Sequence, residues 1–301
     1  MDFYIPTLLD IDLIKSAMRG NEKLTCEMSP ANIILWARYY RTQIAFWNGE
    51  IVFRSEWDNG KVSYSCNILN AKKPRELFDR LIAFAKEEGH TFCMHCMVAQ
   101  EMDMIDSWYP GCYQICYNRD ISDYIYLREK LASLSGKKLH GKRNHIHRFE
   151  EQNPDWRYET ITEENTAECE RMAMQWCMKN CMGEMENIEY EKIDESKLVV
   201  YALRNREIFG MTGGALRVAG NIVAITLGEP LTEDTFVVHF EKAFSEIQGA
   251  YPMINREFVR NELSGYVYVN REEDMGLPGL RKAKLSYRPD ILLEKGVITA
   301  C

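Results

Sequence analysis

Segments typical of helices and strands alternate in a similar order in both halves of this chain, and this order constrains the fold more than any other feature. In the first half, two helical segments precede three strands, a helix and further strands, with an Asn-Gly hairpin signal at 48–49. Such alternation is typical of an α/β fold with a mixed sheet. We therefore predict two domains of one α/β construction, residues 1–130 and 155–301, joined by residues 131–154.

The composition restricts the classes of partner. The chain carries 45 acidic and 37 basic residues, a formal net charge of -8, so the molecule as a whole is not built to coat nucleic acid or an anionic membrane. No run approaches about 18 consecutive apolar residues, so we expect no membrane-spanning segment. The N-terminal residues lack the basic region and apolar run of a targeting signal. Ten cysteines without such a signal predict free thiols and a cytoplasmic location.

The connecting segment is locally basic. Residues 137–148 contain five Lys or Arg, three His and no acidic residue. If the segment is a helix, Lys138, Lys142 and His145 share a polar face. Its thin apolar seam consists of Leu139, Ile146 and Phe149. We predict that Lys138, Lys142, Arg143 and His145 bind phosphate groups, such as those of tRNA. A solvated linker helix would show the same pattern.

Polar side chains follow the predicted strand 266–269. Asn270, Arg271, Glu272 and Asp274 come directly after it, and a Gly-Pro turn then leads into a short basic helix. A strand whose polar end feeds a helix is a plausible binding pocket in an α/β sheet. A solvated charged turn is the alternative.

A second polar group lies near the end of the predicted strand 235–243. By strict alternation His239 and Glu241 share one face of this strand and Lys242 lies on the other. Charges in a mostly buried strand need a partner or a ligand, so both a binding role and a structural ion pair with Arg271 or Arg256 are open. The loop that follows contains Gly249 and precedes a helix, an arrangement that can hold a phosphate.

The substrate-binding residues that we predict are polar or small and belong to these segments: His239, Gly249, Asn255, Asn270, Asp274, Arg281 and Lys284.

Several chemistries are disfavoured. The sequence contains no Gly-x-Ser-x-Gly elbow, P-loop, His-Glu-x-x-His pair or Rossmann glycine series. Cys93 and Cys96 lie near Cys112 and Cys116, but residues three apart on a strand point to opposite faces, so we expect no metal site. A direct transfer reaction, in which positioning of two substrates is the main catalytic effect, remains.

Three segments of the chain resemble one family. They are KKLHGKRNHIHRFEEQNPDWRYETITEEN (137–165), HFEKAFSEIQGAYPMINREF (239–258) and NREEDMGLPGLRKAKLSYRP (270–289). Together they are similar to the bacterial phosphatidylglycerol lysyltransferase C-terminal-domain family, many of whose members are of unknown function. The resemblance implies two tandem GNAT (acetyltransferase-like) domains with mixed sheets, as in the Fem peptidyltransferases. Those relatives move an amino acid from aminoacyl-tRNA onto a lipid or a peptidoglycan precursor.

The resemblance also assigns roles to two strands. In a GNAT domain the fourth and fifth strands run parallel and splay apart, and the acyl donor lies in the gap. Here these strands would be 236–242 and 266–270, which would bring their polar ends to one cleft. The acetyltransferase loop pattern is altered, because Glu246 and Tyr251 stand at its first and last places. A carboxylate there would repel a pyrophosphate, which disfavours ordinary acetyl-CoA binding.

We therefore predict an acyl- or aminoacyltransferase that moves a group from aminoacyl-tRNA or an acyl-CoA donor onto an amine or hydroxyl. Lys242 and Arg271 would offset developing negative charge, and Glu241 or Glu272 would be the general base. A second hypothesis is a non-catalytic module that binds a small anion or nucleic acid. A third is an acetyl-CoA-dependent N-acetyltransferase. The oligomeric state stays open.

Overall fold

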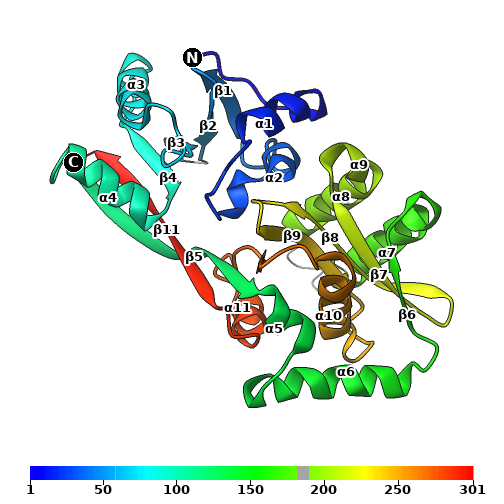
Figure 1. Cartoon of the computed structure of the whole chain (residues 1–301). Helices are drawn as coiled ribbons and strands as arrows, with labels where there is room; N and C mark the ends of the chain where they lie inside the picture. Colours follow the sequence, from blue (N-terminus) through cyan, green and yellow to red (C-terminus); the bar gives the residue numbers. More distant parts are fainter. Residues whose placement is uncertain (58, 182–189, 301) are drawn as a thin grey trace.

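One mixed sheet runs through the whole molecule. The computed structural model describes residues 1–57, 59–181 and 190–300. The strand order is β1-β2-β3-β4-β11-β5-β10-β9-β8-β7-β6 (Figure 1). The strands are β1 (Gln43–Trp47), β2 (Glu50–Glu56), β3 (Val62–Cys66), β4 (Cys93–Met97), β5 (Tyr113–Leu127), β6 (Arg157–Thr160), β7 (Thr212–Val218), β8 (Asn221–Pro230), β9 (Thr235–Ala243), β10 (Tyr268–Asn270) and β11 (Ile291–Ala300). The predicted α/β class with a mixed sheet is confirmed.

Helices pack on both faces of the second half of this sheet. Consecutive residues of a strand point to opposite faces of a sheet. On β9, Glu241 accepts a hydrogen bond from Asn255 on α10, while Lys242 donates one to Glu195 on α8. The helices are α1 (Ile11–Ala17), α2 (Pro30–Leu35), α3 (Pro74–Glu87), α4 (Ala99–Trp108), α5 (Arg128–Ser133), α6 (His140–Gln152), α7 (Glu163–Cys181), α8 (Tyr190–Arg204), α9 (Arg206–Phe209), α10 (Ala250–Glu262) and α11 (Pro278–Leu285), with 3-10 turns η1 (Leu8–Asp10), η2 (Cys26–Met28) and η3 (Lys137–Leu139).

The hairpin between β1 and β2 forms where the sequence predicts it. Asn48 and Gly49 have φ angles of 52° and 88°, and both positions of a type I′ turn need positive φ. This backbone twist matches that of the flanking strands, so the turn fixes the register in which Trp47 opposes Glu50.

Strand β5 belongs to both halves of the sheet, and β11 lies against it. Residues 113–118 of β5 pair with 295–300 of β11, and residues 123–125 pair with 291–293. On its other edge, β5 pairs with β10 at residues 125–127. Because β11 also pairs with β4, the last strand of the chain lies in the part of the sheet that the first half builds (Figure 1). The sheet is therefore not divided at the predicted boundary of 155–301. Whether 1–130 and 155–301 fold as separate domains stays a prediction.

The basic connector is two helices rather than one. α5 ends in a loop at residues 134–136, and α6 begins after η3. The predicted apolar seam is buried: Leu139, Ile146 and Phe149. α6 packs on the start of α10, where a Cβ on Gly249 would lie 2.2 Å from the backbone oxygen of His145. Gly249 also has a φ of 85°, so the fold itself requires glycine at this position.

The substitution Gly249→Ala tests this contact. We expect it to lower the free energy of unfolding by about 2–4 kcal/mol, since alanine at positive φ is strained and its Cβ would overlap α6. Urea denaturation measures the effect. Gly265→Ala is the matched control, because nothing lies within 4 Å of a Cβ there, and we expect a change below about 1 kcal/mol. Equal effects of the two substitutions would contradict the packing role of Gly249.

Candidate functional site at the fork of β9 and β10

Strands β9 and β10 run parallel and then separate, as the resemblance predicts. Their paired residues are 268–270 with 235–237, and β10 ends there while β9 continues to Ala243. We call this point the fork. Because β10 stops, the polar residues that follow Asn270 and those on the second half of β9 face one another without a ladder of backbone hydrogen bonds.

A β-bulge turns His239 toward the fork. Phe240 pairs with Leu227 and Val238 with Gly228, so His239 is the extra residue of β9. A Cβ on Gly228 would lie 2.1 Å from the backbone oxygen of Val237, so the bulge depends on that glycine. Strict alternation fails here, and the prediction that His239 and Glu241 share one face is therefore wrong.

His239 bridges two carboxylates. Its Nδ1 lies 2.8 Å from Glu272 and its Nε2 lies 3.1 Å from Glu229. Burial disfavours the imidazolium, but the hydrogen bonds to both carboxylates outweigh this and raise the pKa of His239 to about 9. The same carboxylates hold α2, because Glu229 accepts from Ala31 N–H and Glu272 accepts from Asn32. The imidazolium therefore ties both sides of the fork to the first half of the chain.

Arg271 is the centre of a second group, the Arg271 cluster, with Glu241, Asn255, Tyr287 and Lys142. Arg271 pairs with Glu241 at 2.7 Å, and Asn255 donates to the same carboxylate at 3.0 Å. The Lys142 ammonium lies 4.0 Å from the Tyr287 ring centroid, and the Arg271 guanidinium lies 4.9 Å from it. Burial and the nearby Arg271 lower the pKa of Lys142 to about 8.

Two buried polar atoms of the Arg271 cluster have no hydrogen-bond partner among the described residues. They are Nη1 of Arg271 and Oδ1 of Asn255. Because a buried polar group without a partner costs free energy, such atoms in a native fold require an explanation. A donor and an acceptor left over beside one carboxylate are suited to a polar ligand.

Lys242 does not join this cluster. Its ammonium pairs with Glu195 at 2.7 Å and lies 4.2 Å from the centroid of a Trp176 ring, on the face of the sheet that α7 and α8 cover. The predicted joint action of Lys242 and Arg271 is therefore wrong. Arg271 pairs with Glu241, and the next residue of β9, Lys242, points to the opposite face.

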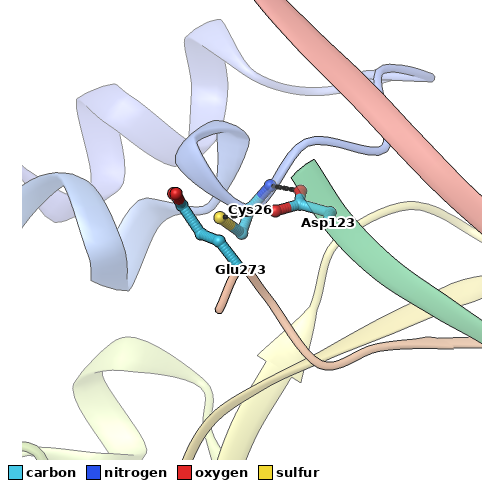
Figure 2. Close-up of side chains that lie close together, drawn as sticks. All are labelled: Cys26, Asp123 and Glu273. Carbon is cyan, nitrogen blue, oxygen red and sulfur yellow. Dashed lines mark hydrogen bonds between the residues drawn. The ribbon is translucent and has the colours of Figure 1, made fainter. Parts of the chain in front are cut away.

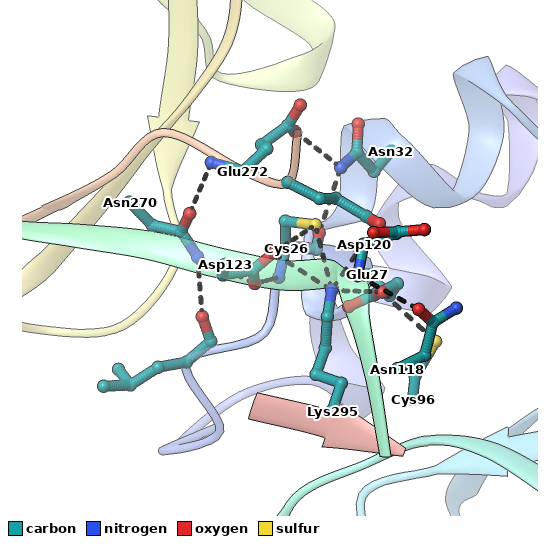
Figure 3. Close-up of polar contacts among 12 residues, drawn as sticks. Cys26, Glu27, Asn32, Cys96, Asn118, Asp120, Asp123, Asn270, Glu272 and Lys295 are labelled. Carbon is teal, nitrogen blue, oxygen red and sulfur yellow. Dashed lines mark hydrogen bonds and ion pairs between the residues drawn. The ribbon is translucent and has the colours of Figure 1, made fainter. Parts of the chain in front are cut away.

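A third group, the Lys295 cluster, lies where the two halves meet and consists of Cys26, Glu27, Asp123, Glu273 and Lys295. Figure 2 shows three of its side chains, from three separate segments, side by side. The Lys295 ammonium lies 2.6 Å from Glu27 and 3.0 Å from Asp123 (Figure 3). It lies 3.5 Å from Glu273. Lys295 and Asp123 are fully buried, while the Glu273 side chain is 22% exposed.

The Lys295 cluster contains three carboxyl groups and one ammonium, so the carboxyl groups titrate at different pH. Burial raises the pKa of Glu27, but Lys295 outweighs this and lowers it to about 2. Burial, only partly offset by Lys295, raises the pKa of Glu273 to about 8. Near neutral pH, Glu273 can therefore both give and take a proton, which is what general acid–base catalysis requires.

The Lys295 cluster does not suit a metal ion. Ligand atoms of Cys26, Asp123 and Glu273 lie within 4.8 Å of one another. The Lys295 ammonium already occupies the position of a cation among them, 3.0 Å from Asp123 and 3.8 Å from the thiol of Cys26. Burial also raises the pKa of Cys26 well above its usual range, which favours the neutral thiol over the thiolate that metals bind.

Several predicted substrate-binding residues hold the chain after β10 in place. Asn270 donates to the backbone oxygen of Leu24 at 2.8 Å and accepts from the N–H of Glu272 at 2.6 Å. Buried Asp274 accepts two hydrogen bonds from Arg281, at 2.8 and 2.7 Å. Lys284 donates to the backbone oxygen of Arg271 at 2.6 Å and to that of Glu273.

The four residues of the connector that were predicted to bind phosphate lie in different places in the structure. Lys142 joins the Arg271 cluster. Arg143 donates to the backbone oxygens of Leu134 and Gly136. Lys138 and the side chain of His145 are exposed. The structure thus does not gather the four residues into one site.

Sequence reasoning missed the residues of the Lys295 cluster. One signal was available: Lys295 interrupts the apolar strand ILLEKGVI, and Asp123 directly precedes the apolar run YIYL. A charge inside a buried strand needs a partner, but neither residue's partner lies nearby in the sequence.

The family model of the phosphatidylglycerol lysyltransferase C-terminal region matches residues 19–297. The chain belongs to this family. A conserved protein of unknown function from Bacteroides thetaiotaomicron is 37% identical, with a TM-score of 0.88 and full coverage of both chains. The C-terminal domain of a putative lysylphosphatidylglycerol synthetase from Agrobacterium fabrum is 11% identical, with a TM-score of 0.66, over 97% of this chain and 91% of that one.

The chain is also similar to an uncharacterized protein of Mycoplasmoides gallisepticum. It is 21% identical over 200 residues, which are 64% of this chain. The chain spans 60% of the length of that curated relative. Throughout residues 1–57, 59–181 and 190–300, each helix is too short or too polar to cross a bilayer.

The substitution His239→Gln tests the charge of the imidazole. Because the folded pKa is raised to about 9 above an ordinary value of 6.5, this group stabilises the fold fully below pH 6.5 and loses that effect as the pH rises through 9. The difference in unfolding free energy between wild type and variant should therefore shrink by on the order of 3 kcal/mol from pH 6 to 9.5. Urea denaturation at both values measures it, and a constant difference would show a neutral His239.

The substitution Lys295→Met tests the Lys295 cluster. Removing the ammonium leaves buried carboxylates unpaired, so we expect a loss of about 3–5 kcal/mol of unfolding free energy at neutral pH. The loss should be smaller at acidic pH, where the carboxyl groups are protonated. Lys86→Met, on the exposed face of α3, is the charge-matched control. A Lys295→Met protein as stable as this control would mean that Lys295 is not required.

Proposed function

We propose that the protein is an acyl- or aminoacyltransferase that moves a group from an aminoacyl-tRNA donor onto an amine or hydroxyl at the fork of β9 and β10. One observation carries this proposal. The segment 271–273 has, at one end, a guanidinium with an unpartnered donor atom and, at the other, a carboxyl group with a pKa of about 8. Membership of the family supports the same class of reaction.

Glu273 is the general base in this proposal, in place of Glu241 and Glu272. Glu241 is paired with Arg271 at 2.7 Å, and Glu272 is paired with His239 at 2.8 Å, so both carboxylates already serve as partners of a cationic side chain. Glu273 lies 3.5 Å from its cation and remains partly exposed. It is therefore the carboxyl group of the fork best suited to take a proton at neutral pH.

The transfer step is an ordinary addition and elimination. The acceptor nitrogen or oxygen forms a bond to the donor carbonyl carbon and gives its proton to Glu273. Arg271, through its free Nη1, and Lys142 offset the negative charge on the carbonyl oxygen. The bond from carbon to the donor oxygen then breaks, and Glu273 returns the proton to that leaving oxygen.

The third hypothesis, ordinary acetyl-CoA chemistry, has less support. The loop before α10 would hold a pyrophosphate in an acetyltransferase, and here α6 packs on it at Gly249. Glu246 in that loop pairs with Lys179, which leaves no cation of this pair free for a phosphate. Both features favour a donor that enters elsewhere.

The substitution Glu273→Gln tests the proposal in an assay of labelled aminoacyl transfer from aminoacyl-tRNA to small amines and alcohols. We expect turnover to fall by roughly 10²–10⁴-fold and the wild-type rate to rise with pH through about 8. Glu76→Gln is the control, because this exposed carboxylate lies on α3 and pairs with Lys73 at 2.9 Å. Wild-type protein that binds tRNA with a steep salt dependence but gives no product would instead support the non-catalytic module.

A further inference from the structure

A basic groove lies at the opposite end of β10 from the fork. It has a volume of about 870 Å³. The groove lies between the residues just before β10, the loop that joins α5 to α6, and Arg288. Its lining contains five cationic residues: Arg128, Lys130, Lys137, Lys138 and Arg288. Exposed apolar side chains, including Leu127 and Val267, form another part of the wall. None of the residues of the Arg271 or Lys295 clusters lines it.

Two of these five cationic side chains have an acidic partner among the described residues, and the other three do not. Arg128 pairs with Glu129 at 2.6 Å and Lys130 pairs with Asp290 at 3.0 Å. Lys137, Lys138 and Arg288 are exposed and have no ion pair or hydrogen bond from their side chains to any described residue. Since the whole chain carries a net charge of -8, three uncompensated positive charges around one concavity give it a local potential opposite to that of the molecule.

Two carbonyl oxygens of the loop between α5 and α6 are occupied by one arginine. Leu134 and Gly136 have positive φ angles of 49° and 85°. Their carbonyl oxygens both accept from Arg143, which does not line the groove. Arg143, which we predicted as an anion ligand, is therefore a positioning residue that fixes the loop from which Lys137 and Lys138 project.

Arg288 is also held in an uncommon backbone conformation. Its φ is 58°, a region that non-glycine residues rarely adopt, and its carbonyl oxygen accepts from Lys130. Such conformations occur most often where a side chain has a function. Arg288 thus completes a cationic rim whose other members come from a segment about 150 residues earlier.

We propose that the basic groove binds a nucleoside di- or triphosphate. Linked phosphates match the three free cations Lys137, Lys138 and Arg288, and the base would lie against the apolar wall at Leu127 and Tyr266. A concave site of this volume with mixed apolar and cationic lining is of the size that encloses a small ligand. The site is separate from the fork, so nucleotide binding does not depend on the proposed transfer reaction.

Isothermal titration of the full chain with ADP and ATP tests the proposal. We expect binding that weakens with salt, and a rise in Kd of at least tenfold in Lys137→Ala/Lys138→Ala. Arg288→Asn should have a similar effect, and asparagine is chosen because it tolerates positive φ. The control Lys86→Ala/Lys282→Ala removes the same charge from exposed positions outside the groove and should keep the wild-type Kd.

Three results would overturn the inference. The first is no binding of ADP or ATP at millimolar concentration to wild-type protein. The second is an equal Kd in the groove variants and the control, with all variants showing the unfolding midpoint of wild type. The third is that a short RNA strand or anionic lipid vesicles bind in a way that the groove variants abolish, while nucleotides do not bind.

Discussion

The contact between one buried ammonium and three carboxyl groups joins the two halves of this molecule. Lys295 lies on the last strand, Asp123 on the strand shared by both halves, Glu27 on the 3-10 turn η2 and Glu273 on the loop after β10. An ammonium out of water is costly unless it is paired, so these segments can be buried together only when all of them are in place. The cluster thus makes the position of β11 and the loop after β10 depend on each other.

The same requirement has a chemical consequence. One ammonium cannot neutralise three carboxylates, and burial beside the other carboxyl groups raises the pKa of Glu273 to about 8. The feature that holds the halves together is therefore also the feature that supplies a titratable group near pH 8. Stability and a capacity for proton transfer arise from one arrangement of charges.

Much of the fold followed from local chemistry. The Asn48-Gly49 turn, the strand 235–243 and the apolar seam of Leu139, Ile146 and Phe149 appear where the sequence predicts them, because each depends on residues close together in the chain. The candidate site was predicted less well. Lys242 was predicted to act together with Arg271, but it lies on the other face of the sheet from the Arg271–Glu241 pair. The bulge at His239 depends on Gly228 of the neighbouring strand.

The sequence by itself determined the α/β class, the turn at Asn48-Gly49 and the crowding of polar groups at the ends of β9 and β10, because propensity and periodicity act over a few residues. Only the tertiary structure decided which charge meets which. Lys295 is separated from Asp123 by 172 residues and from Glu27 by 268, and nothing in the local pattern of either segment specifies that pairing. It follows from the insertion of β11 between β4 and β5, which is a property of the whole sheet.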